Sequence, residues 1–367
     1  MHIAPALLAW HSRHGRHDLP WQREPTAYRV WVSEIMLQQT QVATVIDYFD
    51  RFMQRFPDLR TLAAAPLDEV LHLWSGLGYY SRARNLHRAA QRVIANDDSG
   101  SISGCTLPAD AAALMALPGI GRSTAAAIRA LSAGERAAIL DGNVRRVLAR
   151  FYLIAGVPTQ RAVEQRLWEL AEACTPEQDV AVYTQAIMDL GATVCVRRRP
   201  LCAVCPLEQG CGARRAGRQH EIPTARPRAA RRTRAVVMLF AQRHDGAVLL
   251  ERRPERGIWG GLWCPPQFPS VEAAQLFAAT RLQAAEVDAH AQGIVRHAFT
   301  HFELEISPLH ARCNGWGGVM DSALALWYNP AQPERLGLPA PVTTMLQNLS
   351  HGIPNANPSM SPNTSES

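Results

Sequence analysis

Apolar residues recur at three- and four-residue spacing through the first half of the chain, which is the spacing of amphipathic helices. Prolines interrupt this pattern at short intervals, as at Pro57, Pro66 and Pro108, so each predicted helix is short. The segments with helical spacing are residues 28–53, 67–74, 81–94, 123–131, 144–154 and 163–173. The pattern therefore predicts an all-α unit built from successive helices between about Thr26 and Gly191.

The pattern changes after Ala235, where short apolar runs of the kind found in β-strands replace the helical spacing. The runs 234–242 and 246–253 flank the turn sequence RHDG, which predicts a β-hairpin. The remaining predicted elements are strands within 302–313 and 324–329 and a helix within 271–283. The second half of the chain therefore predicts an α+β unit.

A stretch rich in arginine and proline separates the two units. With 367 residues and 47% apolar content, the chain is long enough for two separate cores. We place the helical domain at residues 1–225, the linker at 226–234 and the α+β domain at 235–350. Residues 351–367 are polar and rich in turn-forming residues, which predicts a disordered tail.

The positive charge of the chain is concentrated in one segment. The net charge is +6, and the segment from Gly212 to Arg234 holds eight arginines and one glutamate, a local charge of +7. A solvated linker or an anionic partner would each account for such a segment. All 38 basic residues are arginines, so no lysine side chain is available for covalent chemistry. No apolar run is long enough to cross a membrane, and no signal peptide precedes the first helix, which predicts a cytoplasmic protein.

Gly119 and Gly121 lie at the start of a predicted helix, in the sequence LPGIGRSTAAAI. Glycines at this place let the backbone turn tightly and bring its N–H groups toward an anion at the helix N-terminus. A plain connection between two helices would also suit these residues. In context, residues 114–130 resemble a helix-hairpin-helix, a module that grips one DNA phosphate and reads no bases.

Two carboxylates are candidates for catalysis. Glu34 has apolar neighbours on both sides within a predicted helix, and burial there would raise its pKa until it held a proton near neutral pH. Asp141 precedes a predicted helix, where capping is the ordinary role of an aspartate. Cleavage of a glycosidic bond uses two carboxylates in different environments, since one protonates the leaving group while the other stabilises the sugar cation.

Four of the eight cysteines form a cluster with the spacing C-x6-C-x2-C-x5-C, at Cys195, Cys202, Cys205 and Cys211. Such a cluster favours metal binding over disulfide bonds in an intracellular chain. A structural zinc site usually presents two close pairs of ligands, whereas this cluster has only one. The spacing matches the [4Fe–4S] loop of the endonuclease III superfamily, and Arg197, Arg198 and Arg199 lie within the loop.

Together these motifs resemble the MutY-type adenine DNA glycosylases, which belong to the endonuclease III or helix-hairpin-helix glycosylase superfamily. The resemblance covers nearly the whole ordered length of the chain. The segments that carry it are residues 19–22, 30–57, 65–90, 117–128, 139–150, 185–211, 257–268, 296–306 and 325–329. It implies an all-α helix-hairpin-helix glycosylase domain with a [4Fe–4S] loop at 195–211, followed by an α+β Nudix-like domain.

The resemblance implies a base excision repair enzyme that hydrolyses the N-glycosidic bond of adenine mispaired with 8-oxoguanine or guanine in double-stranded DNA, after base flipping. By family position Glu34 protonates the base, Asp141 stabilises the oxocarbenium ion, and Asn143 shares their pocket. The positions implied to contact DNA or the base are Trp21, Gln38, Gln39, Thr40, Leu77, Tyr79, Gly119, Gly121, Ser123, Phe299, Thr300 and His301. The resemblance also implies a monovalent cation at the hairpin, a monomer, and a nucleoid-associated protein of bacterial type.

In the Nudix-like domain the family contacts 8-oxoguanine with the tripeptide F-S-H, where this chain has Phe299, Thr300 and His301. The glutamate-rich box that binds Mg²⁺ in Nudix hydrolases is missing, so we expect recognition of 8-oxoguanine without hydrolysis of a nucleotide.

The sequence leaves two main alternatives. The first is a bifunctional endonuclease III-like glycosylase and lyase, which cuts the strand through a lysine at the position of Ser123. The second is a DNA-binding scaffold without catalysis, which would not need both Glu34 and Asp141. Because the chain lacks lysine, we expect release of the base with the strand left intact.

Overall fold

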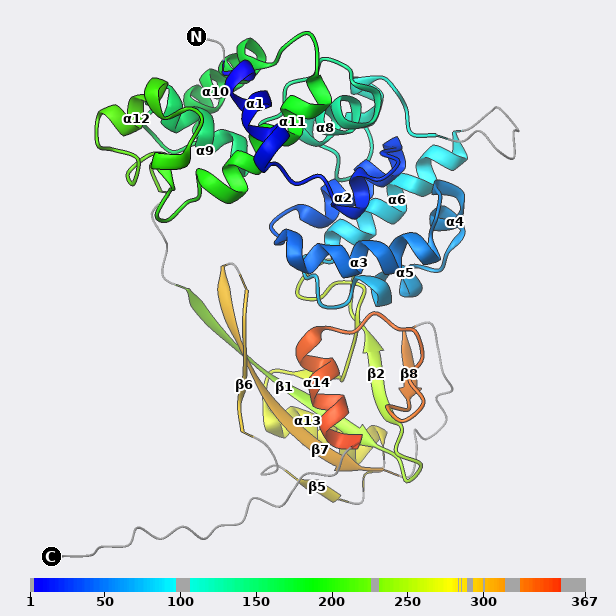
Figure 1. The fold of residues 1–367 in the computed structure, drawn as a ribbon. Helices are drawn as coiled ribbons and strands as arrows, with labels where there is room; N and C mark the ends of the chain where they lie inside the picture. Colours follow the sequence, from blue (N-terminus) through cyan, green and yellow to red (C-terminus); the bar gives the residue numbers. More distant parts are fainter. Residues whose placement is uncertain are drawn as a thin grey trace, which may run out of the picture. The chain divides into compact units, whose positions relative to one another are not determined.

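The computed structural model describes residues 3–96, 106–225, 231–282, 284, 286–288, 293–299, 301–313 and 324–350. The chain divides into two compact units, residues 1–229 and 230–367 (Figure 1). Most of the predicted linker, Thr300 and the predicted tail lie outside the described residues.

All regular elements described in the first unit are helical, which confirms the all-α prediction. The longer helices are α1 (Ala4–His14), α2 (Ala27–Leu37), α3 (Val42–Arg55), α4 (Leu59–Ala64), α5 (Leu67–Trp74), α6 (Ser81–Ala95), α7 (Ala111–Met115), α8 (Arg122–Ala133), α9 (Gly142–Phe151), α10 (Arg161–Cys174), α11 (Val180–Asp189) and α12 (Gly212–Arg215). Helix α1 lies before the predicted segments, and the single apolar pattern of residues 28–53 is divided between α2 and α3.

Local hydrogen bonds account for several helix starts. The side chains of Asp58, Asp110 and Asp141 each accept a hydrogen bond from a backbone N–H in the first turn of the helix that follows. These bonds satisfy donors that have no partner within the helix. Helix α8 ends at Gly134, whose positive φ of 68° suits a C-terminal cap.

The helical unit has two groups of buried residues. One consists of large aromatic side chains from α2 to α5, among which Phe52 packs edge-on against both Phe56 and Trp74. The other joins α1 with α8 to α11 through residues such as Leu7, Leu148 and Ile187. Because each helix buries one apolar face in these groups, the polar residues at the helix ends and loops are held in place.

The second unit is a mixed sheet with two helices (Figure 1). Its elements are β1 (Arg232–Gln242), β2 (Val248–Arg252), β3 (Trp263–Cys264), β4 (Gln267–Phe268), α13 (Val271–Arg281), β5 (Glu286–Asp288), β6 (Val295–Ala298), β7 (Phe302–Arg312), β8 (Ala325–Tyr328) and α14 (Ala340–Ser350). The sheet order is β3-β2-β1-β7-β5, with β4 beside β1, β6 beside β7 and β8 beside β2. Strands β1 and β7 pair in parallel over their full length, from Arg232 opposite Phe302 to Gln242 opposite Arg312.

Both faces of strand β1 are buried in its second half, from Val237 to Ala241. Val237 and Leu239 contact the apolar cluster that includes α13, while the alternate residues Met238 and Phe240 point to the opposite face and are equally buried. The predicted RHDG turn does join β1 to β2 as antiparallel strands, and Gly246 takes a φ of 85° there.

Candidate active site

A cavity of about 750 Å³ lies in the helical unit, between the loop that follows α2 and the N-terminal ends of α8 and α9. Its lining residues extend from Arg16 to Ala192, 176 positions apart in the sequence. The predicted site residues that line it are Trp21, Glu34, Gln38, Gln39, Thr40, Ser123, Asp141 and Asn143. Of the other predicted residues in this unit, Leu77, Tyr79, Gly119 and Gly121 lie outside the cavity lining.

Glu34 projects into the cavity from α2, whose residues Trp31, Val32, Ile35 and Met36 are buried. No hydrogen-bond donor contacts its carboxyl group among the described residues. Burial, together with the smaller effect of the nearby charge of Asp141, raises the pKa of Glu34 to about 8. Glu34 therefore holds a proton at neutral pH.

Asp141 reaches the same cavity from the N-terminus of α9. Its side chain accepts hydrogen bonds from the Val144 backbone N–H at 2.7 Å and from Asn143 Nδ2 at 3.2 Å. Burial raises the pKa of Asp141, whereas these hydrogen bonds and the charge of Arg146 oppose that rise. Asp141 therefore has donors that favour its charged form, whereas no such donor contacts Glu34 among the described residues.

Arg146 connects Asn143 to the segment that leads into the cysteine loop. Its guanidinium donates to Asn143 Oδ1 at 2.8 Å, to the Gly191 carbonyl at 2.5 Å and to the Cys195 carbonyl at 2.7 Å. A side chain at Gly191 would collide with Asn143, because an added Cβ would lie 2.6 Å from the Cβ of Asn143. The turn at Gly191 and the start of α9 are therefore packed together.

The hairpin between α7 and α8 contains the two glycines of the predicted phosphate-binding turn. Gly119 has a φ of 82°, and Gly121 is the N-cap residue of α8. Ser123 Oγ accepts a hydrogen bond from the Leu140 backbone N–H at 3.0 Å. Ser123 therefore holds the backbone one residue before Asp141.

The turn between α5 and α6 contains two of the predicted DNA contacts, Leu77 and Tyr79, which differ in exposure. Leu77 is 6% exposed and packs inside the unit, whereas Tyr79 is 45% exposed and has a φ of 48°. Trp21, which lines the cavity, is buried and packs edge-on against Phe49.

All four clustered cysteines line one small cavity, together with Arg150. Arg150 is 3% exposed, and its Nη1 donates to Cys195 Sγ at 3.3 Å and to the Val196 carbonyl at 2.8 Å. None of the seven described cysteines forms a disulfide bond. Within the described part of the chain, no group of three or more His, Cys, Asp or Glu side chains is arranged around a single metal ion.

In the second unit, Phe299 lies in the turn between β6 and β7. It stacks on Phe302 with the ring centres 4.5 Å apart, and it also contacts His297 and Trp259. His301 is exposed, and Thr300 lies outside the described residues.

Comparison with known proteins identifies both units. Residues 32–173 match the HhH-GPD superfamily of base excision DNA repair proteins, and residues 236–348 match the NUDIX domain. The chain is 36% identical over 351 residues to the adenine DNA glycosylase of Buchnera aphidicola subsp. Acyrthosiphon pisum (strain APS), which covers 95% of this chain and 97% of that protein. The chain belongs to the adenine DNA glycosylase family.

Other matches that cover less of the chain agree with this membership. The human adenine DNA glycosylase is 45% identical over 226 residues, which are 59% of this chain and 40% of the human protein. The solved structure of a thermostable thymine-DNA glycosylase matches with a TM-score of 0.51 and 28% identity, over 58% of this chain and 95% of that one. The predicted fold class, a helix-hairpin-helix glycosylase domain followed by a Nudix-like domain, is confirmed.

Among the described residues, no helix is both long enough and apolar enough to cross a membrane.

The structure also reveals cavity residues that the sequence analysis missed. Arg16 and Gln185 line the cavity, and both bond Asp189, which is fully buried. Arg16 donates to Asp189 through Nε at 2.9 Å and Nη2 at 2.6 Å, and Gln185 Nε2 donates to it at 2.7 Å. A polar residue within the mostly apolar α11 was the only sequence signal for Gln185, and Arg16 had none.

The buried carboxyl of Glu34 generates a prediction about stability. Its pKa is about 8 in the folded protein and near 4.5 when exposed, so the unfolded chain ionises first as the pH rises. Between these values the wild type loses up to about 1.4 kcal/mol of unfolding free energy per pH unit, and Glu34→Gln loses none through this group. We expect the advantage of Glu34→Gln over the wild type to grow from pH 5 to pH 8 in urea unfolding followed by far-ultraviolet circular dichroism.

The exposed Glu169 provides the control, since Glu169→Gln should follow the wild type at every pH. Parallel pH curves for Glu34→Gln and the wild type would show that the Glu34 carboxyl is not held neutral by the fold.

Proposed function

We propose that this chain is a monofunctional DNA glycosylase of base excision repair, which hydrolyses the N-glycosidic bond of adenine opposite 8-oxoguanine or guanine in double-stranded DNA. One observation carries the proposal. Glu34 and Asp141 line the same cavity, where burial keeps a proton on Glu34, and hydrogen bonds from Val144 and Asn143 favour the ionised form of Asp141 against the effect of burial. A glycosylase needs this pair of an acid and a carboxylate beside the flipped nucleotide.

The acid–base steps follow from that arrangement. The Glu34 carboxyl donates its proton to N7 of adenine, so that the base leaves as a neutral molecule when the bond to C1′ of the sugar breaks. The Asp141 carboxylate stabilises the oxocarbenium ion that remains. Glu34, now ionised, accepts a proton from the water that attacks C1′, and this restores its acid form. Asn143 keeps the Asp141 carboxylate oriented through their hydrogen bond.

We assign the selection of adenine to Gln185, a polar residue that lines the same cavity as the two carboxyl groups. The Nε2 group of Gln185 is engaged by Asp189, which leaves its carbonyl oxygen as the atom that can accept a hydrogen bond in the cavity. Adenine presents a donor at its exocyclic amine, whereas guanine presents an acceptor at the same place. Gln185 would therefore favour adenine, with Trp21 packing beside the base.

Contacts to DNA extend from the cavity. The hairpin at Gly119 and Gly121 would hold a phosphate, together with a monovalent cation. The exposed Gln39 and Tyr79, with Gln38, Thr40 and Leu77 near them, would fill the space left by the flipped base. The enzyme would act as a monomer on DNA in the cytoplasm, at the nucleoid.

The four clustered cysteines would hold a [4Fe–4S] cluster. They fit such a group because all four line one cavity, none forms a disulfide, and the Arg150 guanidinium donates to Cys195 Sγ, where it would stabilise thiolate charge. The cluster would supply a structural anchor for the loop. Anchored in this way, the exposed Arg197, Arg198 and Arg199 would face the phosphate backbone.

Strand cleavage should be absent. A lyase step needs an amine that forms a Schiff base with the sugar, and the chain has no lysine. The position of the lyase lysine holds Ser123, which is occupied in bonding Leu140. Arg145, on α9, pairs with Glu164 and lines the cavity without a nucleophilic amine.

The second unit would recognise 8-oxoguanine opposite the adenine. The proposal assigns residues 1–225 to catalysis, 226–234 to the linker, 235–350 to recognition and 351–367 to the tail. Phe299 is supported by stacking on Phe302 and is only partly exposed, while the exposed His301 would contact the damaged base beside Thr300. Helix α13 contains a single carboxylate, Glu272, so we expect no Mg²⁺-dependent hydrolysis.

Excision assays test the catalytic assignment. Glu34→Gln should slow adenine release at least 10³-fold in single-turnover reactions, because a neutral amide cannot deliver the proton. Wild-type excision should fall tenfold per pH unit above about 8, where Glu34 loses its proton. Strands should break only after alkali treatment of the product. Glu169→Gln should react like the wild type, and adenine release by Glu34→Gln at the wild-type rate would remove Glu34 from the acid role.

Metal analysis tests the cysteine cluster. The purified protein should be brown and should contain about four irons and four sulfides per chain. Cys202→Ser should lower the iron content, whereas Cys174→Ser should not, because Cys174 lies outside the cluster cavity. Stoichiometric zinc in place of iron would contradict the assignment.

Substitution in the second unit tests recognition of the damaged base. His301→Ala should reduce the preference for adenine opposite 8-oxoguanine over adenine opposite guanine by about tenfold, because one contact to the damaged base is lost. The rate on adenine opposite guanine should stay within about twofold of the wild type. His244→Ala, at an exposed turn of the same unit, is the control. An unchanged preference in His301→Ala would mean that His301 does not read the opposite base.

A further inference from the structure

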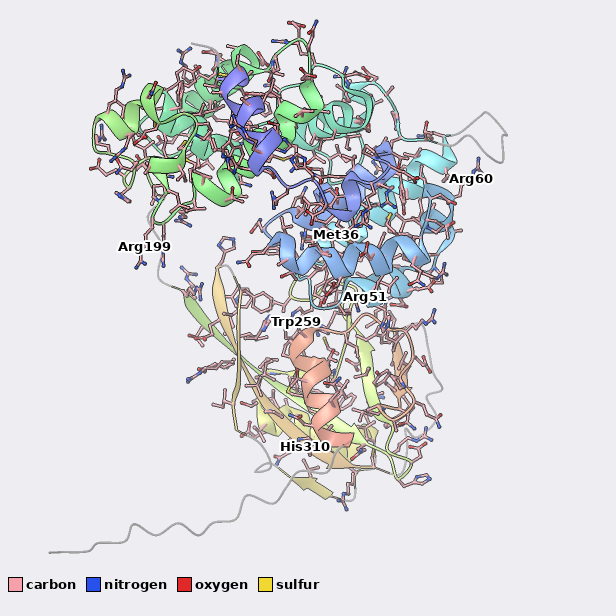
Figure 2. All side chains as sticks on the ribbon, viewed as in Figure 1. Met36, Arg51, Arg60, Arg199, Trp259 and His310 are labelled. Carbon is pink, nitrogen blue, oxygen red and sulfur yellow. The ribbon has the colours of Figure 1, made fainter. Side chains whose placement is uncertain are left out.

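Arg82 is a buried cation that holds two separate loops. It lies in the first turn of α6 and is 8% exposed. Its Nη1 group donates to three backbone carbonyls at the end of α2 and in the loop that follows, with Met36 labelled in Figure 2. The three acceptors are the carbonyl oxygens of Ile35 at 2.9 Å, Met36 at 2.8 Å and Gln38 at 2.6 Å.

The other end of the guanidinium faces the turn between α5 and α6. Nη2 donates to the carbonyls of Leu77 and Gly78, both at 3.1 Å, and to Thr40 Oγ1 at 3.2 Å. The Gly78 carbonyl also accepts a hydrogen bond from Trp74 Nε1 at 3.2 Å. One planar group therefore bonds the loop that follows α2 and the turn that carries Tyr79.

The guanidinium has no carboxylate partner among the described residues. Its charge is met by carbonyl oxygens and by the faces of Trp74 and Tyr79, whose ring centres lie 5.4 and 5.5 Å from its central carbon. Burial lowers the pKa of Arg82 to about 10, so the side chain is still charged at neutral pH. A buried charge that is held by five backbone carbonyls and one hydroxyl, all from these two loops and the end of α2, fixes the conformations of both loops.

Two of the carbonyls that Arg82 bonds, those of Gln38 and Gly78, each precede a residue with a positive φ. The Gln38 carbonyl directly precedes Gln39, which has a φ of 59°, and the Gly78 carbonyl directly precedes Tyr79, which has a φ of 48°. Residues with side chains rarely adopt this left-handed conformation, and such strain persists only where the surroundings enforce it. Arg82 bonds the peptide group before each of the two strained residues.

We propose that Arg82 is a positioning residue which holds Gln39 and Tyr79 in the left-handed conformations from which their side chains enter the DNA duplex. The inference rests on the proposed function, because it concerns how the two side chains replace the flipped base. Lysine cannot take over this role, since a single ammonium group lacks the two-ended fork that spans both loops.

The test measures base unstacking separately from chemistry. In a Glu34→Gln background, 2-aminopurine beside the target adenine, opposite 8-oxoguanine, reports unstacking by its fluorescence. We expect Arg82→Lys to remove most of the fluorescence rise that the Glu34→Gln protein produces. Arg92→Lys, an exposed arginine on the same helix, is the matched control and should keep the full rise.

Kinetics with Glu34 intact provide a second readout. Arg82→Lys should slow single-turnover excision at least tenfold, while its Kd for undamaged duplex stays within threefold because the phosphate contacts remain. A mismatched base pair next to the target lowers the cost of unstacking and should restore most of the rate. Gln39→Asn should also restore part of the rate in Arg82→Lys, because asparagine adopts the left-handed conformation more readily.

The outcomes that overturn the proposal are distinct. Excision by Arg82→Lys within threefold of the wild type, or slow excision with full fluorescence and no recovery on the mismatched substrate, would show that Arg82 supports only the general fold.

If Arg82→Lys does not fold, Thr40→Val carries the same test. Of the six oxygen atoms that accept from Arg82, Thr40 Oγ1 is the one that belongs to a side chain, and valine replaces it without changing the shape of that side chain. For that variant, an unchanged fluorescence rise is the overturning result. Wild-type excision in the same assay shows separately whether the proposed function holds, since the fluorescence arm needs no base release.

Discussion

The constraint on which the helical unit depends is the burial of two carboxyl groups in one cavity. Glu34 and Asp141 come from different helices, and each would lower the free energy of unfolding if it were ionised without partners. The fold provides different surroundings for the two carboxyl groups. It places Glu34 among buried apolar residues of α2 with no hydrogen-bond donor among the described residues, and it gives Asp141 the backbone N–H of Val144 at the start of α9. The difference between an acid and a carboxylate is therefore a property of the packing around two chemically similar side chains.

A second feature follows from the arginine-only composition. Arg82, Arg146 and Arg150 are cations of the helical unit that bond backbone carbonyls from segments distant in sequence. Each guanidinium presents up to five donors in one plane, so one side chain can connect two or three loops. Arg82 makes these connections at the loop after α2, Arg146 at the start of α9, where it also lines the cavity, and Arg150 at the cysteine loop. Irregular segments of the helical unit are thus bonded to one another by guanidinium groups.

Much of the site could be predicted from the chain alone. The spacing of the cysteines, the hairpin glycines and the apolar neighbours of Glu34 are local patterns, and the structure brings Glu34, Asp141, Asn143 and Ser123 to one cavity as expected. The β-hairpin at RHDG was also predictable, because its turn residues act locally. Other features were not. The break between α2 and α3 contains no proline or glycine, and the carbonyl of Gln38 within it is bonded by Arg82, more than forty residues away.

The sequence by itself determined the family, the two-unit organisation, the chemical types of the site residues and the absence of a lysine nucleophile, because these depend on residue identity and short spacing. The tertiary structure decided which residues share an environment. It paired Arg16 with Asp189 across 173 positions, buried Leu77 while exposing Tyr79, and aligned β1 with β7 in parallel. The pKa of Glu34 belongs to this second group, since desolvation is a property of all the atoms around the carboxyl and of no single stretch of chain.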